Sequence, residues 1–377
     1  MIDLHHLRGA LRSHLQSRQL ATSDDELSLL AHGEANVIFR LRGDRLVRVA
    51  VNTPNQRFGG DFSRVTRFEW TILQYLKGSG LGHDLWEAQL EPSVDFPYTY
   101  LITNYIPGQP LDYSREHLQQ CATTLARLHS LPLQPGYEQL QALTPPVQRV
   151  SRPLSLFFQE ARDYARPYLE AAGADPAIVE RLRAVLAKAE ARLAAEALLA
   201  VSPHECLVHS DHTYENWVVG DAQAFLIDWE WAEIGSPAGD LGHFLSPVTV
   251  RRRQGYVMPD ADRQYFLQSY YEALGDSRLA ETLRLHFAVF GAFPAVRSLC
   301  WTAGYWITAN RWYAESVETS ASAAERMARL LMGIQFVLIR SGLSGTLLGV
   351  VLVHLLPTIS LYDASAEQRL CQLRCRL

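Results

Sequence analysis

Three side chains in one stretch of the sequence have the types and spacing that phosphoryl transfer requires. Asp211 and Asn216 lie five residues apart between strand-like runs, and Asp228 ends the next such run. Phosphoryl transfer needs one group that orients the attacking hydroxyl, and hard oxygen ligands that hold Mg²⁺ against the phosphates. The sequence therefore indicates a phosphoryl-transfer site with a base, a carboxamide ligand and a carboxylate ligand.

The first 105 residues have the pattern of a small sheet-rich lobe. Apolar residues at helical spacing predict helices over 4–15 and around 68–76. Runs of β-type residues separated by turn residues predict strands over 27–31, 36–41, 46–51 and 98–105. We interpret the first three strands as an antiparallel meander.

Helical spacing dominates beyond residue 108. Helices are predicted around 118–128 and over 177–199, and the proline-containing segment 131–152 is interpreted as a connector. Short strands are predicted at 206–209, 216–219 and 224–227. The predicted fold class is α+β, with a small antiparallel-sheet N-lobe over 1–105 and a larger, mainly helical C-lobe over 106–344.

The last residues, 345–377, are predicted to form an apolar tail. A membrane-spanning helix needs about 20 apolar residues, and His354 and Pro357 interrupt this run. We interpret the tail as a buried or docked segment, and membrane attachment through residues 345–361 remains the alternative.

The composition is that of an ordinary soluble enzyme. Hydrophobic residues make up 48% and charged residues 20% of the 377 positions, and the net charge of −5 gives no basic field for nucleic acid. The five cysteines are odd in number and scattered, which favours reduced thiols in a cytoplasm. The N-terminus has no pattern of a secretory signal, so a cytoplasmic location is predicted. The oligomeric state stays open.

The stretch from His209 to Asn216 resembles the catalytic loop of the aminoglycoside phosphotransferase and choline kinase families, small-molecule relatives of protein kinases. Their loop reads His-x-Asp-x-x-x-x-Asn, which His209, Asp211 and Asn216 match. Their metal-binding element reads Ile-Asp-Trp or Ile-Asp-Phe, which Ile227-Asp228-Trp229 matches. The resemblance implies that Asp211 is the catalytic base, that His209 braces the loop, and that Asn216 and Asp228 bind Mg²⁺.

A third motif follows at Gly235–Leu241. It resembles the Gly-Asp-Pro-x-x-Asp-Leu element of these families, in which the last Asp braces the catalytic loop, and this implies that role for Asp240. Several motifs in a fixed order are more specific than any one of them. The resemblance implies a bilobal protein-kinase-like fold, ATP and Mg²⁺ as cofactors, and transfer of the ATP γ-phosphate to a hydroxyl of a small molecule.

The third strand carries an arginine where kinases carry a lysine that touches the α- and β-phosphates. That position is Arg48, and the chain has lysine only at Lys77 and Lys188. Arginine holds phosphates bidentately but is bulkier than lysine, so the exchange is not neutral. Glu69 on the following helix matches the acidic partner of this cation. The alternative for Arg48 and Glu69 is a solvent-exposed ion pair.

The remaining nucleotide contacts are expected at a turn and at a hinge. The turn at Gly33 lies where these families cover the nucleotide, although it has only one glycine. The segment with Asn104, Tyr105 and Ile106 resembles the inter-lobe hinge, whose backbone would bind adenine. His129, on the helix after the hinge, is interpreted as structural.

The sequence leaves the acceptor open. Glu215, Glu230 and Glu233 add negative charge near the motifs, which would suit a cationic acceptor such as an amino sugar or a choline-like amine. Tryptophans follow the motifs as well, and they could form a cage for a quaternary amine, although aromatic side chains at helical spacing are more often core residues.

Two other activities are consistent with parts of the sequence. A nucleotide-binding protein that transfers no phosphate is suggested by Arg48 and by the single glycine of the turn. A protein kinase is disfavoured, because the segment between Asp228 and Asp240 is too short for an activation loop that docks peptides.

Overall fold

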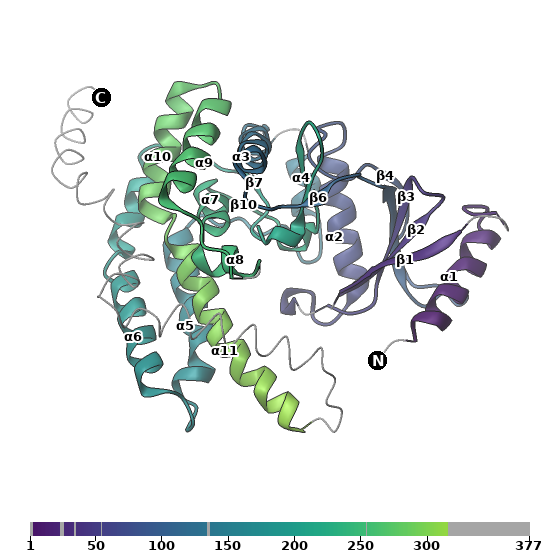
Figure 1. Cartoon of the computed structure of the whole chain (residues 1–377), viewed down its shortest axis with the longest axis horizontal. Helices are drawn as coiled ribbons and strands as arrows, with labels where there is room; N and C mark the ends of the chain where they lie inside the picture. Colours follow the sequence, from purple (N-terminus) through teal and green to yellow (C-terminus); the bar gives the residue numbers. More distant parts are fainter. Residues whose placement is uncertain are drawn as a thin grey trace. The chain divides into compact units, whose positions relative to one another are not determined.

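The computed structural model describes residues 3–22, 26–33, 35–53, 55–133, 136–253 and 255–315 (Figure 1). The chain forms two compact units, and each is assembled from three stretches. Unit 1 contains Met1–Leu111, Pro132–Gln148 and Glu215–Ala232, and unit 2 contains Asp112–Leu131, Arg149–Tyr214 and Glu233–Leu377. The predicted division at 105/106 stays a prediction, and the predicted tail 345–377 lies outside the described residues.

Unit 1 is built on a five-stranded antiparallel sheet with the strand order β1-β2-β3-β5-β4. The strands are β1 (Leu27–His32), β2 (Asn36–Leu41), β3 (Arg45–Ala50), β4 (Leu85–Gln89) and β5 (Thr99–Asn104). The predicted antiparallel meander over β1, β2 and β3 is confirmed. Sequence analysis missed β4, whose Glu87 and Gln89 interrupt the apolar pattern.

One helix covers each face of this sheet. Apolar residues of α1 (Leu4–Ser17), such as Leu11, pack on the face that carries Phe39 and Ile102. The other face meets α2 (Phe62–Tyr75), where Thr66 and Thr99 share a 2.7 Å hydrogen bond between their hydroxyl oxygens. Alternate residues of a strand point to opposite faces, so Arg48 of β3 lies on the face of α2, opposite that of Val47 and Val49.

The rest of unit 1 comes from later parts of the sequence. A small antiparallel sheet contains β6 (Gln109–Pro110), β8 (Trp217–Val219) and β9 (Ala224–Leu226), in the order β6-β8-β9. Gly108 permits the close approach of this chain segment, because a Cβ atom there would lie 2.7 Å from the Val219 carbonyl oxygen. Beyond β9, the turns of η4 (Trp229–Trp231) contact α2, and this contact places Asp228 beside the main sheet's helix.

Unit 2 is mainly helical. Its elements are α3 (Arg115–His129), α5 (Pro153–Leu169), α6 (Pro176–Glu190), η2 (Leu193–Ala200), β7 (Cys206–Val208), β10 (Glu233–Gly235), α7 (Ala238–Phe244), α8 (Pro247–Arg251), α9 (Asp260–Ala273), α10 (Ser277–Phe290) and α11 (Phe293–Glu315). The main core lies between α5, α6, α10 and α11. In Figure 1, α5 and α11 run side by side, in agreement with their extensive packing.

Two predicted elements differ from the structure. The single helix expected over 177–199 ends at Glu190 and continues as the 3₁₀ turns of η2, whose residues are all at least partly exposed. Leu193, Leu198 and Leu199 of this run pack against the core of unit 2 but are only partly buried, so no fully buried apolar stripe stabilises an α-helix there. The connector 131–152 contains a short helix, α4 (Tyr137–Gln141), which is fixed by the burial of Leu140. Within the described residues, no helix is long and apolar enough to cross a membrane.

Candidate active site

In unit 1, Arg48 joins two carboxylates that come from distant parts of the sequence. Its Nη1 donates to Glu69 Oε1 of α2 at 2.8 Å, and its Nη2 donates to Asp228 Oδ1 at 2.6 Å. The Arg48 side chain is only 17% exposed and that of Glu69 only 4%, so the pair lies inside the unit. The alternative of a solvent-exposed ion pair for Arg48 and Glu69 is therefore wrong.

Asp228 occupies a strained position at the end of β9. Its backbone has φ 67° and ψ 68°, which lies in the left-handed region. This conformation is energetically unfavourable for any residue with a Cβ atom, and such strained residues cluster at functional sites. Two contacts stabilise this turn: Arg48 binds the carboxylate, and the following N–H of Trp229 donates to Glu69 Oε1 at 3.1 Å. The Asp228 side chain remains 37% exposed, so it is accessible to a ligand.

The charges in this group depend on one another. Burial by itself would lower the pKa of Arg48, but Asp228 and then Glu69 raise it above its ordinary value, so the guanidinium stays charged. Burial raises the pKa of the Glu69 carboxyl to about 7, and the charge of Arg48 opposes this rise. The charge of Arg48, together with the hydrogen bond from the Trp229 N–H, thus favours the ionised form of the Glu69 carboxyl.

The donor atoms of Asn216 and Asp228 fit a magnesium ion in their chemistry. A carboxylate and a carboxamide are hard oxygen ligands, and Mg²⁺ in phosphoryl-transfer sites uses one or two carboxylates together with water and phosphate oxygens. The backbone links the two positions, because the N–H of Ile227 donates to the Asn216 carbonyl at 3.0 Å. No cluster of three or more His, Cys, Asp or Glu side chains among the described residues could form a closed metal cage.

The predicted hinge residues also lie in unit 1, at the end of β5. The Asn104 N–H donates to the Asp84 carbonyl at 3.1 Å, and the Tyr105 N–H donates to the Asp44 carbonyl at 2.7 Å. Their N–H groups are therefore used within the fold. Ile106 follows both and lies outside the strand, so we expect its backbone to offer the hinge N–H for a nucleobase.

The turn that contains Gly33 closes the hairpin between β1 and β2. The Gly33 N–H donates to the Asn36 carbonyl at 2.9 Å, and the chain returns along β2. Sequence analysis missed a second function of this turn. With its carboxamide oriented by the surrounding donors, the Asn36 side-chain oxygen accepts from Arg48 Nη2 at 2.8 Å and from Nε at 3.2 Å. The predicted turn thus contacts the Arg48 guanidinium through the Asn36 side chain.

In unit 2, Asp240 of α7 is the centre of the second group of predicted residues. Its carboxylate is fully buried and accepts the N–H of His209 at 2.9 Å and the N–H of Ser210 at 2.8 Å. His129 Nε2 lies 3.1 Å from Oδ2, and His212 Nε2 lies 3.0 Å from Oδ1. This is the contact that the resemblance implies for Asp240, although its role in catalysis stays a prediction.

The loop before Asp211 has an unusual backbone. Ser210 has φ 66°, and the Asp211 N–H donates to His209 Nδ1 at 3.3 Å. On the other side of Asp211, the His212 N–H donates to His243 Nδ1 of α7 at 3.0 Å. The loop is thus fixed to α7 at Ser210 and at His212, and Asp211 between them is half-buried. The strain at Ser210 is compatible with a functional role for this loop.

His129 has the structural environment that was expected for it. The side chain is fully buried, and its second nitrogen, Nδ1, lies 2.8 Å from the Tyr270 hydroxyl of α9. Burial by itself would raise the pKa of Asp240, but the charge of His212 and the hydrogen bond to His129 hold it well below its usual range. Sequence analysis missed His212, His243 and Tyr270. The histidines near the motifs in the sequence were the available signal for the first two.

Acidification is expected to destabilise the folded chain through buried histidines. Burial lowers the pKa of His129 below 6.5 and that of His243 well below it. The unfolded chain then binds protons near pH 6.5 that the folded chain does not, so stability is complete above that pH and falls below it. Each such histidine contributes up to about 1.4 kcal/mol per pH unit in this range. Urea denaturation at pH 7, 6 and 5 measures the slope.

The matched variant for this pH dependence is His243→Asn, because its side-chain oxygen can accept the His212 N–H in place of Nδ1. The variant should show a shallower fall in the free energy of unfolding between pH 6.5 and 5. An unchanged slope would mean that His243 does not contribute to the acid instability.

Two of the acidic residues considered for the acceptor are not surface residues. Glu230 and Glu233 are each 6% exposed, and Glu233 accepts a hydrogen bond from the Ser210 hydroxyl at 3.1 Å. Among the tryptophans, Trp217 and Trp229 are fully buried, as expected for core residues. Two of the three carboxylates considered for a cationic acceptor are thus part of the packed interior.

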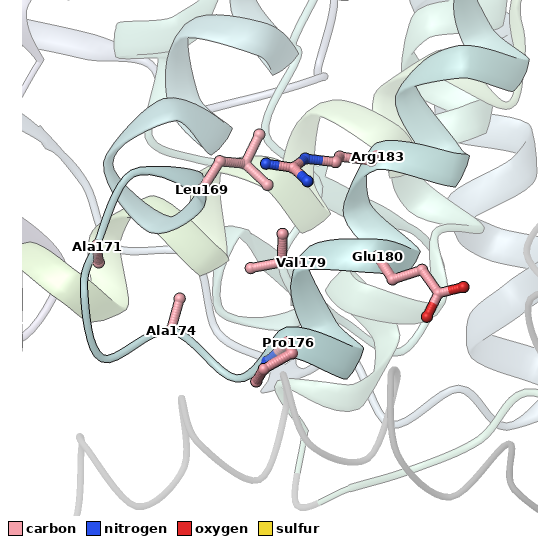
Figure 2. Close-up of a pocket in the computed structure, with 7 residues that line it drawn as sticks. All are labelled: Leu169, Ala171, Ala174, Pro176, Val179, Glu180 and Arg183. Carbon is pink, nitrogen blue, oxygen red and sulfur yellow. The ribbon is translucent and has the colours of Figure 1, made fainter.

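A hollow of about 390 Å³ in unit 2 contains none of the predicted site residues. It lies between the end of α5 and the start of α6, as Figure 2 shows. Its lining is Leu169, Ala171, Ala174, Pro176, Val179, Glu180 and Arg183. No side chain in this lining has been assigned a chemical role by the motifs, so we do not identify the hollow with the active site.

Comparison with protein families agrees with the motifs. The model of the family described as "Phosphotransferase enzyme family" matches residues 26–280, which include every predicted site residue. No curated protein matches the chain. The family match covers more than half of the sequence and both groups of residues described above.

Several solved structures have the same fold. A choline/ethanolamine kinase family protein from Mesorhizobium loti superposes with a TM-score of 0.53 at 16% identity, covering 88% of this chain and 99% of that one. An aminoglycoside phosphotransferase in a ternary complex with streptomycin and ATP has a TM-score of 0.51 at 17% identity, covering 89% and 99%. An aminoglycoside 2′-phosphotransferase with GDP has a TM-score of 0.53 at 14% identity, covering 87% and 98%. The α+β kinase-like fold is thereby confirmed.

Proposed function

The chain belongs to the phosphotransferase enzyme family, and from this premise we propose that it transfers the γ-phosphate of ATP to a hydroxyl group of a small molecule. The observation that carries the proposal is the loop around Asp211, which Asp240 fixes through the N–H groups of His209 and Ser210. Such rigid positioning of a carboxylate suits a general base, which must meet the attacking hydroxyl in one geometry.

Asp211 would accept the proton of the acceptor hydroxyl as its oxygen attacks the γ-phosphorus. Asn216 and Asp228 would hold Mg²⁺, which when bound neutralises charge on the phosphate oxygens. Asp240 and His209 would act by positioning, since both contact the loop that carries Asp211. None of these roles requires a covalent intermediate, which agrees with the dependence of phosphoryl transfer on positioning and electrostatics.

The nucleotide would bind to unit 1. Arg48 and Glu69 supply the cation and its acidic partner, and the backbone at Ile106 supplies the expected hinge contact. Gly33, Asn104 and Tyr105 shape the same region through backbone hydrogen bonds. ATP is proposed as the donor on the resemblance, and the related structures include complexes with ATP, ADP and GDP. Comparing the rates of transfer with ATP and with GTP would measure the nucleotide preference of this chain.

The acceptor is proposed to be a small hydroxyl compound that carries an amine. The related structures are of a choline/ethanolamine kinase family protein and of aminoglycoside phosphotransferases, whose acceptors have both groups. In this chain Glu215 is exposed in the loop after Asp211, and it is the remaining exposed carboxylate of the three considered. Opposite charge favours a cationic acceptor at such a position.

A second candidate function is nucleotide binding without transfer. The observation that favours it is the 2.6 Å hydrogen bond from Arg48 to Asp228. In this arrangement the proposed phosphate-binding cation is paired with the proposed metal ligand, so neither is available for its role in transfer. The two functions differ in turnover and not in nucleotide affinity.

The test is acceptor-stimulated ATP consumption. The purified chain with Mg²⁺ and ATP is incubated with amino sugars, choline-like amines, amino alcohols and neutral sugars, and ADP formation is followed. We expect stimulation by at least one amine-bearing acceptor, with a phosphorylated product in the mass spectrum. Stimulation by neutral sugars alone would contradict the cationic acceptor. Tight nucleotide binding without turnover on any acceptor would favour the second function.

A further inference from the structure

The guanidinium of Arg48 has almost no donor left for a phosphate. An arginine side chain carries five N–H groups. Nη1 uses one on Glu69, Nη2 uses one on Asp228 and one on Asn36, and Nε uses one on Asn36, so four are engaged with these three residues. Among the described residues, the second N–H of Nη1 has no acceptor. A bidentate phosphate contact by Arg48 thus requires that at least one of these hydrogen bonds be broken.

Asp228 is the partner most readily exchanged. Its side chain is 37% exposed, whereas that of Glu69 is 4% exposed and Glu69 also accepts the Trp229 N–H. Asn36 is 9% exposed and belongs to the main sheet. A cation that arrives from solvent can therefore reach the Asp228 carboxylate, and its charge can replace that of Arg48 there.

We propose that Arg48 and the metal ion compete for the Asp228 carboxylate, so that metal binding frees Arg48 Nη2 to donate to the nucleotide phosphates. This inference rests on the proposed function, because it takes Asp228 as a metal ligand. Arg48 is then a positioning residue that sets the metal affinity of the protein. The exchange keeps Asp228 neutralised throughout: by the guanidinium before the metal binds and by the metal afterwards.

Competition and simple support by Arg48 predict opposite changes in metal affinity. If Arg48 competes, its removal leaves the carboxylates of Asp228 and Glu69 available and metal binding becomes tighter. If Arg48 only holds Asp228 in its left-handed conformation, its removal releases the strain, Asp228 turns away and metal binding becomes weaker. The sign of the change therefore decides between the two.

The experiment measures binding of Mn²⁺ to the full chain without nucleotide, from the electron paramagnetic resonance signal of the free ion. In Arg48→Met we expect the Kd for Mn²⁺ to fall about fivefold or more, as expected when a charged competitor is removed from a partly exposed carboxylate. Arg48→Lys keeps the charge on a shorter side chain, and a smaller fall is expected. Asp228→Asn should abolish this binding.

Arg45→Met is the matched control. It removes the same charge from the same strand, but the Arg45 guanidinium lies over the Trp86 ring and makes no ion pair with a carboxylate among the described residues. We expect its Kd for Mn²⁺ to equal that of the wild type. If the Kd for Mn²⁺ fell as much in Arg45→Met as in Arg48→Met, loss of positive charge anywhere near the site would explain both changes, and the proposal would be overturned.

Weaker or unchanged Mn²⁺ binding in Arg48→Met also overturns competition. If that variant does not fold, as judged from its thermal melting, Arg48→Lys carries the test, and unchanged or weaker binding there has the same meaning. Absence of Mn²⁺ binding to the wild type and to Arg48→Met alike would also overturn the proposal, whereas binding that appears only in Arg48→Met would support it. Each readout is a binding constant, so these outcomes are separate from failure of the proposed function, which appears as missing acceptor-stimulated turnover.

Discussion

Asp211→Asn is expected to lower kcat for phosphoryl transfer roughly a thousandfold, the effect of removing a positioned general base. The substitution keeps the size of the side chain and removes the charge that accepts the hydroxyl proton. The loop should keep its conformation, because Asp240 holds the N–H groups of His209 and Ser210, and His243 accepts the N–H of His212. Initial rates with a saturating acceptor measure the change.

The affinity for ADP should stay within about twofold in this variant, because the proposed nucleotide contacts lie in unit 1 and Asp211 lies in unit 2. Asp221→Asn, an exposed carboxylate in the turn between β8 and β9, serves as the control and should retain wild-type rates. Substantial turnover by Asp211→Asn would remove the base assignment, and parallel losses of rate and ADP affinity would indicate a structural role instead.

Asp240→Asn is expected to cost about 3–5 kcal/mol in the free energy of unfolding, the range for breaking a buried, hydrogen-bonded charge pair. The carboxylate is fully buried, and it accepts two backbone N–H groups and lies within 3.1 Å of His129 and His212. A carboxamide offers one oxygen in place of two, so its NH₂ group would face an N–H donor. The remaining partners would then be buried without an acceptor.

The measurement is urea denaturation at pH 7.5, followed by tryptophan fluorescence and far-UV circular dichroism. Asp262→Asn is the matched control, because Asp262 pairs with the exposed Arg115 at 3.0 Å and should contribute less than about 1 kcal/mol. If Asp240→Asn lowered the free energy of unfolding as little as the control does, the buried hydrogen-bond partners of Asp240 would have to rearrange to compensate for the lost carboxylate. The catalytic loop would then not depend on Asp240.

The sequence itself carried enough information for the fold class and for the positions of most elements of unit 1. Periodicity of two and of 3.6 residues, with turn residues between the runs, located β1, β2, β3, β5, α1 and α2. Strand β4 was not predicted, because it is short and Glu87 and Gln89 interrupt its apolar residues. Its pairing with β5 depends on contacts across the sheet. Local propensity does not record such partners.

Helical composition was a less reliable guide in unit 2. The Ala/Leu-rich run over 177–199 has high helix propensity throughout, yet the α-helix ends at Glu190 and the last turns are 3₁₀. Burial of Leu182 and Val185 holds the first part, whereas no residue of η2 is buried. Packing of one face, more than propensity, decides how far a helix extends.

The motifs determined the identities of the candidate site residues, since spacing along the chain is a property of the sequence alone. His209, Asp211, Asn216, Asp228 and Asp240 were found in this way, and their roles remain predictions. Only the tertiary structure decided their partners. It joined Arg48 to Glu69, to Asp228 and to Asn36, and gathered His129, His212 and two backbone N–H groups around Asp240. The reason is physical: hydrogen bonds and ion pairs act over a few ångströms in space, and the partners of Arg48 lie 12, 21 and 180 positions away in the sequence.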